Sequence, residues 1–308
     1  MAAYIFKRFM AMMMTIWVIA TLTFMLMHAV PGSPFNVEGN MSDAVQKNLE
    51  SHYQLDKPIY IQYLRYLKSI AMLDFGPSIK QPSQTVNDMI GRGFPVSFEL
   101  GMIALVIAVI SGITLGVIAA LRHNGVIDYL AMTIAVLGIS IPNFIMATML
   151  IQQFAVTWGI FPTATWASVK HMILPTVALA TGPMAIIARL TRSSMLEVLT
   201  QDYIRTAKAK GLSPTKIIIK HALRNALMPV VTILGALTAG ILTGSFVIER
   251  IFAIPGMGKY FVESINNRDY PVIMGTTVFY SAFLIFMLFL VDLAYGVLDP
   301  RIKLHKKE

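Results

Sequence analysis

Long apolar runs separated by shorter polar stretches make up most of the chain. Runs on the order of 20 residues predict helices that cross a membrane, because a hydrocarbon core about 30 Å thick needs about that length. A helix also satisfies its own backbone hydrogen bonds in lipid. We therefore expect an all-α integral membrane protein with six transmembrane helices. The predicted spans lie at about 9–30, 97–121, 129–158, 172–191, 226–248 and 273–298.

Prolines fall inside the third and fourth of these runs. Pro142 lies in the third span, and Pro175 and Pro183 lie in the fourth. Proline lacks the backbone N–H and clashes with the preceding helical turn. We expect each proline to kink or break its helix locally, with neighbouring helices satisfying the freed carbonyls.

Basic residues gather on one side of the predicted spans, whereas acids and bases nearly balance on the other side. The positive-inside rule places the basic side in the cytoplasm, so both termini are expected to be cytoplasmic. The basic side carries Lys7, Arg8, Arg122, the charges from Arg192 to Arg224, and those from Arg301 to Lys307.

Composition agrees with a membrane protein. Hydrophobic residues make up 56% and charged residues 13% of the chain, against about 25% charged residues in an ordinary soluble domain. The net charge of +9 lies beside apolar runs without an aromatic-interleaved basic patch, so we expect no nucleic acid partner. The absence of cysteine excludes disulfides and thiolate chemistry.

The pattern predicts four parts along the chain. Residues 1–30 hold the first transmembrane helix, retained because its apolar run is long for a secretory signal and no A-x-A cleavage site follows. Residues 31–96 form an extracytoplasmic segment, and 97–298 form a core of five helices with a cytoplasmic loop at about 192–225. Residues 299–308 form a cytoplasmic tail.

The extracytoplasmic segment contains a helical pattern. Tyr60, Leu64, Leu67 and Ile70 lie on or near one helical face. Such a helix either lies flat at the outer membrane interface, where Tyr is favoured, or caps the mouth of a pathway. The sequence leaves both alternatives open.

A basic segment at 202–229, which we call the helix–glycine–helix segment, is the most informative part of the cytoplasmic side. Small residues separate its charges, and Gly211 ends a first helix. Ser213 and Pro214 predict a second helix, because Ser is a good N-cap and Pro suits the first helical position. The alternative interpretation is a basic loop that only fixes topology.

The second helix carries basic residues at intervals of four. Lys216, Lys220 and Arg224 should share one face, while Ile217 and Ala222 supply apolar area elsewhere. A loop that serves topology alone does not need this spacing. We expect the segment to offer a rigid surface to a cytoplasmic partner.

Several motifs resemble the inner-membrane permease subunit of bacterial ATP-binding-cassette importers for dipeptides and oligopeptides. The resemblance runs nearly from end to end. It is carried by HAVPGSPF at 28–35, DFGPSIK at 74–80, GISIPNF at 138–144, RLTRSSMLEVLTQDYIRTAKAKGL at 189–212, KHALRNALMPVVT at 220–232, GSFVIERIFAIPGMGKYFVESINNRDYPVIMG at 244–275 and DLAYGVLDPRIK at 292–303.

This resemblance implies the type I ABC importer permease fold over 97–298. It also implies that the short helix before Gly211 couples the permease to an ATPase. The acid that leads the family's general pattern is absent, and Pro229 lies further downstream than that pattern has it, so the residue that contacts the ATPase is left open. The implied coupling residues are Asp202, Arg205, Thr206, Ala207, Lys208, Ala209, Gly211 and Leu212.

The resemblance further implies the assembly and its location. The partners would be a homologous second permease, two ATP-binding cassette subunits, an extracytoplasmic peptide-binding (lipo)protein and membrane lipid. ATP and Mg would bind the partner ATPases, with no cofactor in this chain. The complex would move dipeptides or oligopeptides by alternating access across the bacterial cytoplasmic membrane. Oligopeptides, dipeptides, murein peptides and nickel chelates remain alternative cargoes.

The chain itself is not expected to hydrolyse ATP. Gly256-Met257-Gly258-Lys259 lacks the first glycine of a phosphate-binding loop. It also has Tyr260 where that loop needs Ser or Thr after the lysine.

A stripe of small residues in the fifth predicted span includes Gly235, Ala239 and Thr243. It would either allow close helix contact or line a weakly selective pathway. Glu99 and Asp292 lie near span ends, where they are either hydrated or paired. One such pair would join Asp292 to Arg189.

Two rival functions belong to other classes. A gradient-driven secondary transporter or channel would act alone, without ATP. A membrane scaffold would assemble with partners and move no solute. Neither rival accounts for the helix–glycine–helix segment as well as an ATP-driven importer does.

Overall fold

The computed structural model describes residues 2–30, 51, 55–243 and 245–298. The regular elements within these ranges are helices, apart from one isolated bridge between Pro77 and Thr85. The chain divides into two compact units, one of residues 1–95 with 256–308 and one of residues 96–255. The cytoplasmic tail predicted at 299–308 lies outside the described residues.

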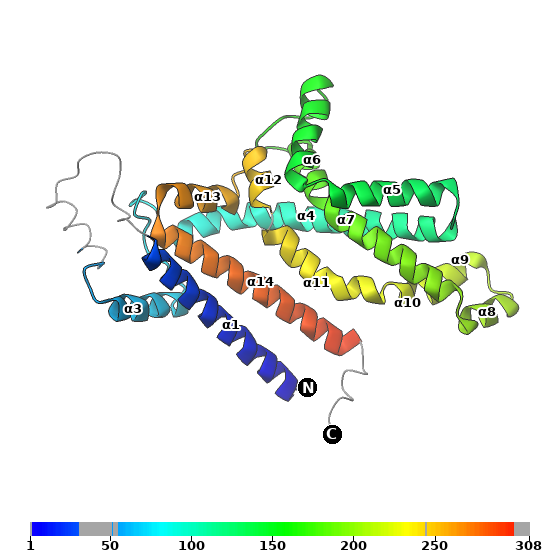
Figure 1. Cartoon of the computed structure of the whole chain (residues 1–308), viewed down its shortest axis with the longest axis horizontal. Helices are drawn as coiled ribbons and strands as arrows, with labels where there is room; N and C mark the ends of the chain where they lie inside the picture. The colour runs from blue at the N-terminus through cyan, green and yellow to red at the C-terminus, as the bar shows by residue number, and fades with distance from the viewer. Residues whose placement is uncertain (1, 31–50, 52–54, 244, 299–308) are drawn as a thin grey trace. The chain divides into compact units, whose positions relative to one another are not determined.

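The first unit contains two long apolar helices that pack along each other, α1 (Ala2–Ala29) and α14 (Tyr270–Leu298) (Figure 1). The amphipathic helix α3 (Ile59–Ala71) packs against α1, and α13 (Met257–Asn267) packs against α14. The N-terminal part of α4 (Val86–Leu121) also belongs to this unit.

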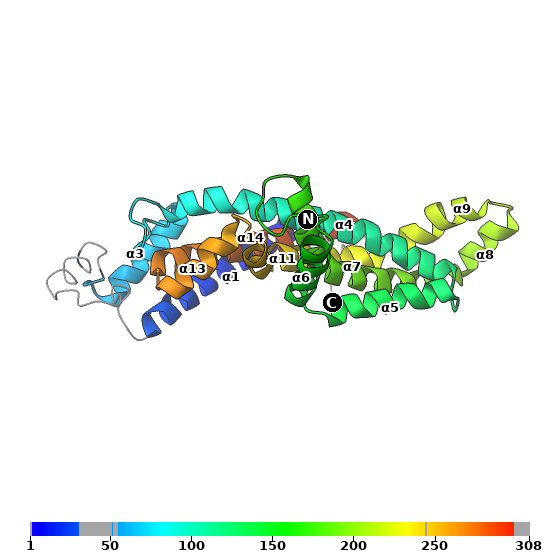
Figure 2. The same ribbon diagram turned by 90° about the horizontal axis from the view of Figure 1, so that it is seen from above.

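The second unit is built around α7 (Val169–Leu199). The helices α5, α6 and α11 all pack against it, and Figure 2 shows α5 and α7 running side by side. Its further elements are the rest of α4, α5 (Val126–Ser140), α6 (Asn143–Leu150), the π-helix η1 (Ile151–Thr157), α8 (Asp202–Ala209), α9 (Pro214–Lys216), the π-helix η2 (Ile217–Leu223), α10 (Arg224–Ala226), α11 (Met228–Thr243) and α12 (Phe246–Ile251).

The predicted spans correspond to helices of the structure. Within the described residues five single stretches are long and apolar enough to cross a membrane, and α5 with α6–η1 makes a sixth if this pair is counted as one span. The pair is bent by 107°, which is far more than a local kink. The five single stretches are Ile5–Ala29, Val86–Leu121, Val169–Leu199, Met228–Ile251 and Tyr270–Leu290.

Pro142 explains where the third span breaks. Ile141, the residue before it, is extended at φ −88° and ψ 117°, as expected for a residue that precedes proline. Pro142 then serves as the N-cap of α6, and its carbonyl accepts the amide hydrogen bond of Met146 at 3.0 Å. The predicted break is confirmed.

The prolines of the fourth span act differently. Pro175 and Pro183 lie inside α7, which continues through both without interruption. Of the two predicted effects, a break is therefore excluded at both positions, and a local kink stays a prediction. The neighbouring helices that pack against α7 hold it together where a hydrogen bond is missing.

A stripe of small buried residues at intervals of four runs along α4. It allows close approach to α7, because a Cβ at Gly112 would lie 2.7 Å from the carbonyl oxygen of Met184. A Cβ at Gly116 would lie 2.5 Å from that of Ala188. Helices in membranes use this small-residue spacing to pack closely. The stripe consists of Ala104, Ala108, Gly112, Gly116 and Ala120.

Candidate functional site

The helix–glycine–helix segment is present as predicted, and its first helix, α8, ends in a hydrogen-bonded turn. The Leu212 amide donates to the carbonyl of Ala207 at 3.3 Å, and the Gly211 amide donates to that of Lys208 at 3.0 Å. This pair of bonds is the Schellman motif, which requires a left-handed residue after the C-cap. Gly211 supplies it with φ +73°. A Cβ there would meet no atom within 4 Å. The backbone angle alone, and not lack of space, therefore favours glycine at this position.

The second helix of the segment is less regular than predicted. Pro214 occupies the first helical turn as expected, but the Ser213 side chain at the N-cap makes no capping hydrogen bond. After three residues the α-helix α9 gives way to the π-helix η2. π-helical turns often occur at functional sites. Lys216, Lys220 and Arg224 are all exposed, as predicted.

A buried apolar cluster anchors α8 to the rest of its unit. Ile204 and Ala207 point inward from α8 and are 0% and 6% exposed. They pack with Met195 of α7, and Leu212 packs against the same cluster. The other buried members are Ala120 of α4, Ile217 and Ala222 of η2, and Ala226 of α10. The cluster therefore joins α8 to α4 and α7.

The opposite face of α8 is polar and exposed. Arg205 and Asp202 form an ion pair at 3.5 Å whose side chains are 75% and 96% exposed, so it contributes little to stability. Ala207 is buried and Leu212 half-buried, so these two support the helix from within. The exposed members of the predicted coupling set are Asp202, Arg205, Thr206, Lys208, Ala209 and Gly211.

A single turn of α7 connects this helix to two other helices. Thr191 lies against Gly116 of α4, where an added Cβ would come within 2.6 Å of the Thr191 Cβ. Arg192, the next residue, reaches Asp128 of α5. Met195 belongs to the cluster beneath α8. Residues 191–195 therefore join α4, α5 and α8.

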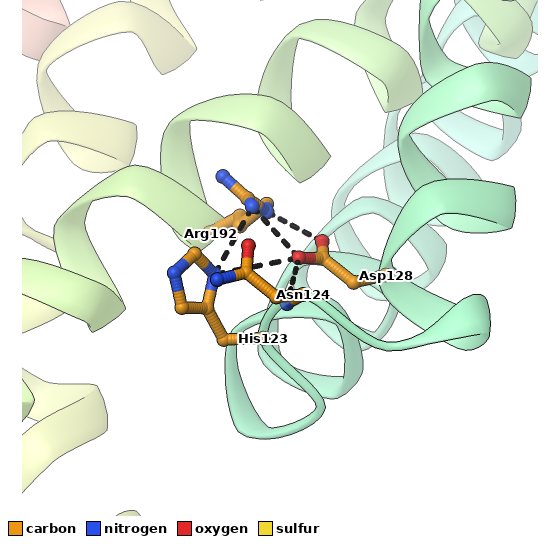
Figure 3. Close-up of polar contacts among 4 residues, drawn as sticks. All are labelled: His123, Asn124, Asp128 and Arg192. Carbon is orange, nitrogen blue, oxygen red and sulfur yellow. Dashed lines mark hydrogen bonds and ion pairs between the residues drawn. The ribbon is translucent and has the colours of Figure 1, made fainter.

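The contact of Arg192 with α5 is a buried, two-pronged ion pair (Figure 3). The Arg192 Nε donates to Asp128 Oδ1 at 2.6 Å, and Nη2 donates to Oδ2 at 2.7 Å. The side chain of Asp128 is 2% exposed and that of Arg192 is 24% exposed. Such paired geometry compensates the cost of burying the carboxylate.

The turn between α4 and α5 completes this cluster. The Asn124 amide donates to Asp128 Oδ2 at 3.0 Å, and Asn124 takes the left-handed φ of +59° that asparagine tolerates. His123 Nδ1 lies 3.4 Å from the same oxygen and 3.3 Å from Arg192 Nη2. Figure 3 shows His123, Asn124 and Arg192 around the Asp128 carboxylate. These contacts fix the turn to α5 and α7.

Sequence reasoning did not identify Asp128. A signal was present, because Asp128 is an acid at the start of an apolar run on the side where basic residues gather. A carboxylate at such a place needs a nearby cation, and Arg192 follows the next predicted span. Which of the basic residues is its partner depends on helix packing that the sequence pattern does not give.

Other candidate residues remain untested. Gly235 and Ala239 are buried within the chain, and the side chain of Thr243 lies outside the described residues, so their pathway role stays a prediction. The proposed pair of Asp292 with Arg189 also involves a side chain outside the described residues. Glu99 is exposed on α4. In the described part of the chain no three His, Cys, Asp or Glu side chains gather as a metal site would need.

Comparisons with known proteins agree with this architecture. Residues 112–304 match the family "Binding-protein-dependent transport system inner membrane component", and residues 1–100 match the family's N-terminal region. The chain is 76% identical to the dipeptide transport system permease protein DppB of Bacillus subtilis over 100% of both chains. It is 44% identical to the oligopeptide transport system permease protein OppB of Haemophilus influenzae, over 98% of this chain and 100% of that protein.

Solved structures give a likeness of fold. A chain of the MetNI methionine ABC transporter in an inward-facing conformation matches with a TM-score of 0.57 and 18% identity. The match covers 68% of this chain and 96% of that one. Another inward-facing crystal form of the same transporter gives a TM-score of 0.54 at 20% identity, over 68% and 94% of the two chains.

Proposed function

The chain belongs to the family of inner membrane components of binding-protein-dependent transport systems, and on this premise we propose that it is the permease subunit of a dipeptide or oligopeptide importer. The cargo follows from the likeness to DppB and OppB. As a member of this family it is a multi-pass inner membrane protein. It is not itself an enzyme, and it acts with a binding protein and an ATPase.

The full assembly contains a second, homologous permease, two ATP-binding cassette subunits and an extracytoplasmic peptide-binding (lipo)protein. ATP and Mg bind to the cassette subunits. Type I importers of this kind alternate between inward-open and outward-open states. ATP binding drives the switch only if the ATPase holds the permease differently in the two states.

The observation that carries the coupling role is the two-sided construction of α8. Its outer face presents the exposed Asp202, Arg205 and Lys208 to the solvent, as a cytoplasmic docking surface requires. Its inner face is fixed to α7 through Ile204, Ala207 and Met195. Movement of a docked ATPase is passed through this cluster to α7, and through residues 191–195 to α4 and α5.

Reconstitution tests this function directly. The chain is purified with its co-expressed partners and placed in liposomes with ATP inside and the binding protein with labelled dipeptide outside. Uptake that needs both ATP and the binding protein is expected. Uptake by this chain alone, driven by an ion gradient without ATP, would contradict the proposal and support the gradient-driven rival. Assembly with partners but no uptake of any peptide would support the scaffold.

A further inference from the structure

The helix α3 contacts α1 along one narrow strip. The Tyr63 hydroxyl is 2.7 Å from Thr21 Oγ1, and the Tyr66 and Tyr63 rings pack on Phe24 with centroids 5.6 and 5.3 Å away. Burial raises the pKa of the Tyr66 phenol above its ordinary value. The strip therefore fixes α3 to a definite place on α1, with the Tyr66 hydroxyl buried.

That place lies beside the membrane-embedded stretch of α1. The apolar stretch Ile5–Ala29 has 25 residues, so it is about 38 Å long and extends only about 4 Å beyond each side of a 30 Å hydrocarbon core. Thr21 comes eight residues before Ala29. It lies about 12 Å from that end of the helix, and hence about 8 Å inside the core. In Figure 1, α3 lies beside the end of α1 that is remote from the N-terminus.

The exposed surface of α3 has two sides of different chemistry. Tyr60 and Leu64, one turn apart, are 66% and 61% exposed, and together with Leu67 they follow the i, i+4, i+7 spacing of one helical face. Arg65 is exposed on the neighbouring face, and Lys68, one turn after Leu64, is exposed at the border between the two faces. An apolar face beside a basic face is the pattern of a helix that lies in the plane of a membrane interface.

The end of α3 enlarges the apolar side. Met72 and Leu73 follow the last helical turn and are 66% and 71% exposed. Leu73 adopts the left-handed φ of +55°, which is strained for a leucine, and the Asn87 side chain holds its carbonyl through a hydrogen bond of 2.6 Å. Backbone strain of this kind is commonly kept for a functional reason. Here it places a large apolar side chain on the surface.

We propose that α3 is an interfacial helix that inserts Tyr60, Leu64, Met72 and Leu73 into the lipid leaflet beside α1, with Arg65 and Lys68 at the anionic phosphates. Lipid is the occupant because the surface continues that of a membrane-spanning helix at a depth that lies among the acyl chains. The basic side chains match the charge of phospholipid headgroups. The positive-inside pattern makes this the outer leaflet. The inference decides between the two roles that the sequence left open for this helix.

The absence of native cysteine makes the test specific. Leu64→Cys and the matched control Arg65→Cys, both exposed and on neighbouring faces of the helix, each carry an environment-sensitive NBD fluorophore. The full chain, assembled with its partners, is placed in nanodiscs of phosphatidylcholine and phosphatidylglycerol. Quenching is measured with a nitroxide on the upper acyl chain and separately with aqueous iodide. Tyr60→Cys gives a second reading of the apolar side if the Leu64 variant fails to assemble.

The label at position 64 should emit at shorter wavelength than the label at 65, lose more fluorescence to the lipid nitroxide and lose less to iodide. Equal iodide quenching at 64 and 65 would overturn the proposal, since the apolar side would then face water. Protection of position 64 from both quenchers would also overturn it, because a protein partner would then cover α3. The readout needs no transport, so it is independent of the cargo.

Discussion

The helices α8 and α3 end in the same backbone motif with different residues at its critical position. In each, the amide two positions after the C-cap bonds back to a carbonyl in the last helical turn, Leu212 to Ala207 and Asp74 to Ser69. The left-handed residue is Gly211 in the first motif and Leu73 in the second. The backbone requirement is therefore the same, and only the surroundings explain why one site has glycine and the other a strained leucine.

The surroundings differ in what each helix exposes. The helix α8 buries Ile204 and Ala207 and exposes charges, which suits docking in water. The helix α3 packs half-buried tyrosines against α1 and exposes large apolar side chains. The apolar side chain of Leu73 is favourable if it enters lipid. At the corresponding position after α8, Gly211, an apolar side chain would face water and bring no such gain. The same local geometry thus serves two different environments.

Loss of the ion pair between α7 and α5 should have the largest effect. Arg192→Met leaves the buried Asp128 carboxylate without its cation, which is expected to cost about 3–5 kcal/mol of folding free energy. Thermal unfolding of the purified complex in detergent measures this loss of stability. Asp128→Asn should cost less, because Arg192 is 24% exposed and its charge can reach water. Equal losses from the two variants, with additive effects in the double variant, would show that the pair does not act as a unit.

A buried side chain of α8 and an exposed one of α3 should respond very differently to truncation. Ile204→Ala opens a cavity in the cluster under α8 and is expected to cost about 2–5 kcal/mol, as other buried truncations do. Leu64→Ala is the matched control, because that side chain is 61% exposed and fills no core. The thermal unfolding midpoint of Ile204→Ala should therefore be clearly lower than that of Leu64→Ala. If Leu64→Ala is as destabilising as Ile204→Ala, then α3 packs on protein and not on lipid.

Exchanging the residues of the two motifs should give effects of opposite sign. Gly211→Leu introduces left-handed strain of about 1–2 kcal/mol, and Leu73→Gly relieves a similar amount. Membrane insertion should stay normal in both, while Gly211→Leu, like a β-branched replacement, should abolish peptide uptake. Gly211→Asn serves as control, since asparagine tolerates this φ. Normal uptake by Gly211→Leu would remove the argument that α8 needs a fixed end.

The smallest structural effect is expected from the exposed ion pair on α8. Asp202→Ala removes the partner of Arg205, and because both side chains face solvent the unfolding midpoint should not change measurably. ATP hydrolysis by the assembled transporter, stimulated by binding protein and peptide, gives the informative readout. A loss of stimulation at unchanged stability would assign Asp202 to the ATPase contact. Unchanged stimulation would leave that contact to Arg205 or Lys208.

Local signals predicted much of this molecule. The apolar runs located the spans, Pro142 located the break in the third, and Gly211 followed by Pro214 located the helix–glycine–helix segment. Each of these rests on a few neighbouring residues whose effect on the backbone is direct. The 107° bend, the π-helical turn at Ile217–Leu223 and the continuity of α7 through its prolines were not predicted. They depend on how α7 packs against its neighbours.

The ion pair of Asp128 with Arg192 was missed for the same reason. The two residues are 64 positions apart, and their meeting depends on α4 and α5 lying against one face of α7. The small residues at Gly112 and Gly116 permit part of that packing, but a small-residue spacing does not name its partner helix. Long-range contacts of this kind are specified by the whole fold, so no single motif reveals them.

Cross-linking from the exposed face of α8 tests the central claim most directly. Arg205→Cys, the sole cysteine in the chain, carries a short photoreactive group in the fully assembled transporter, and Val169→Cys, 72% exposed on the predicted opposite side, is the control. The account predicts an adduct with the ATP-binding cassette subunit from position 205 and none from 169. An assembled, active transporter that gives no such adduct at 205, or gives it equally at 169, would contradict the assignment of α8 as the coupling helix.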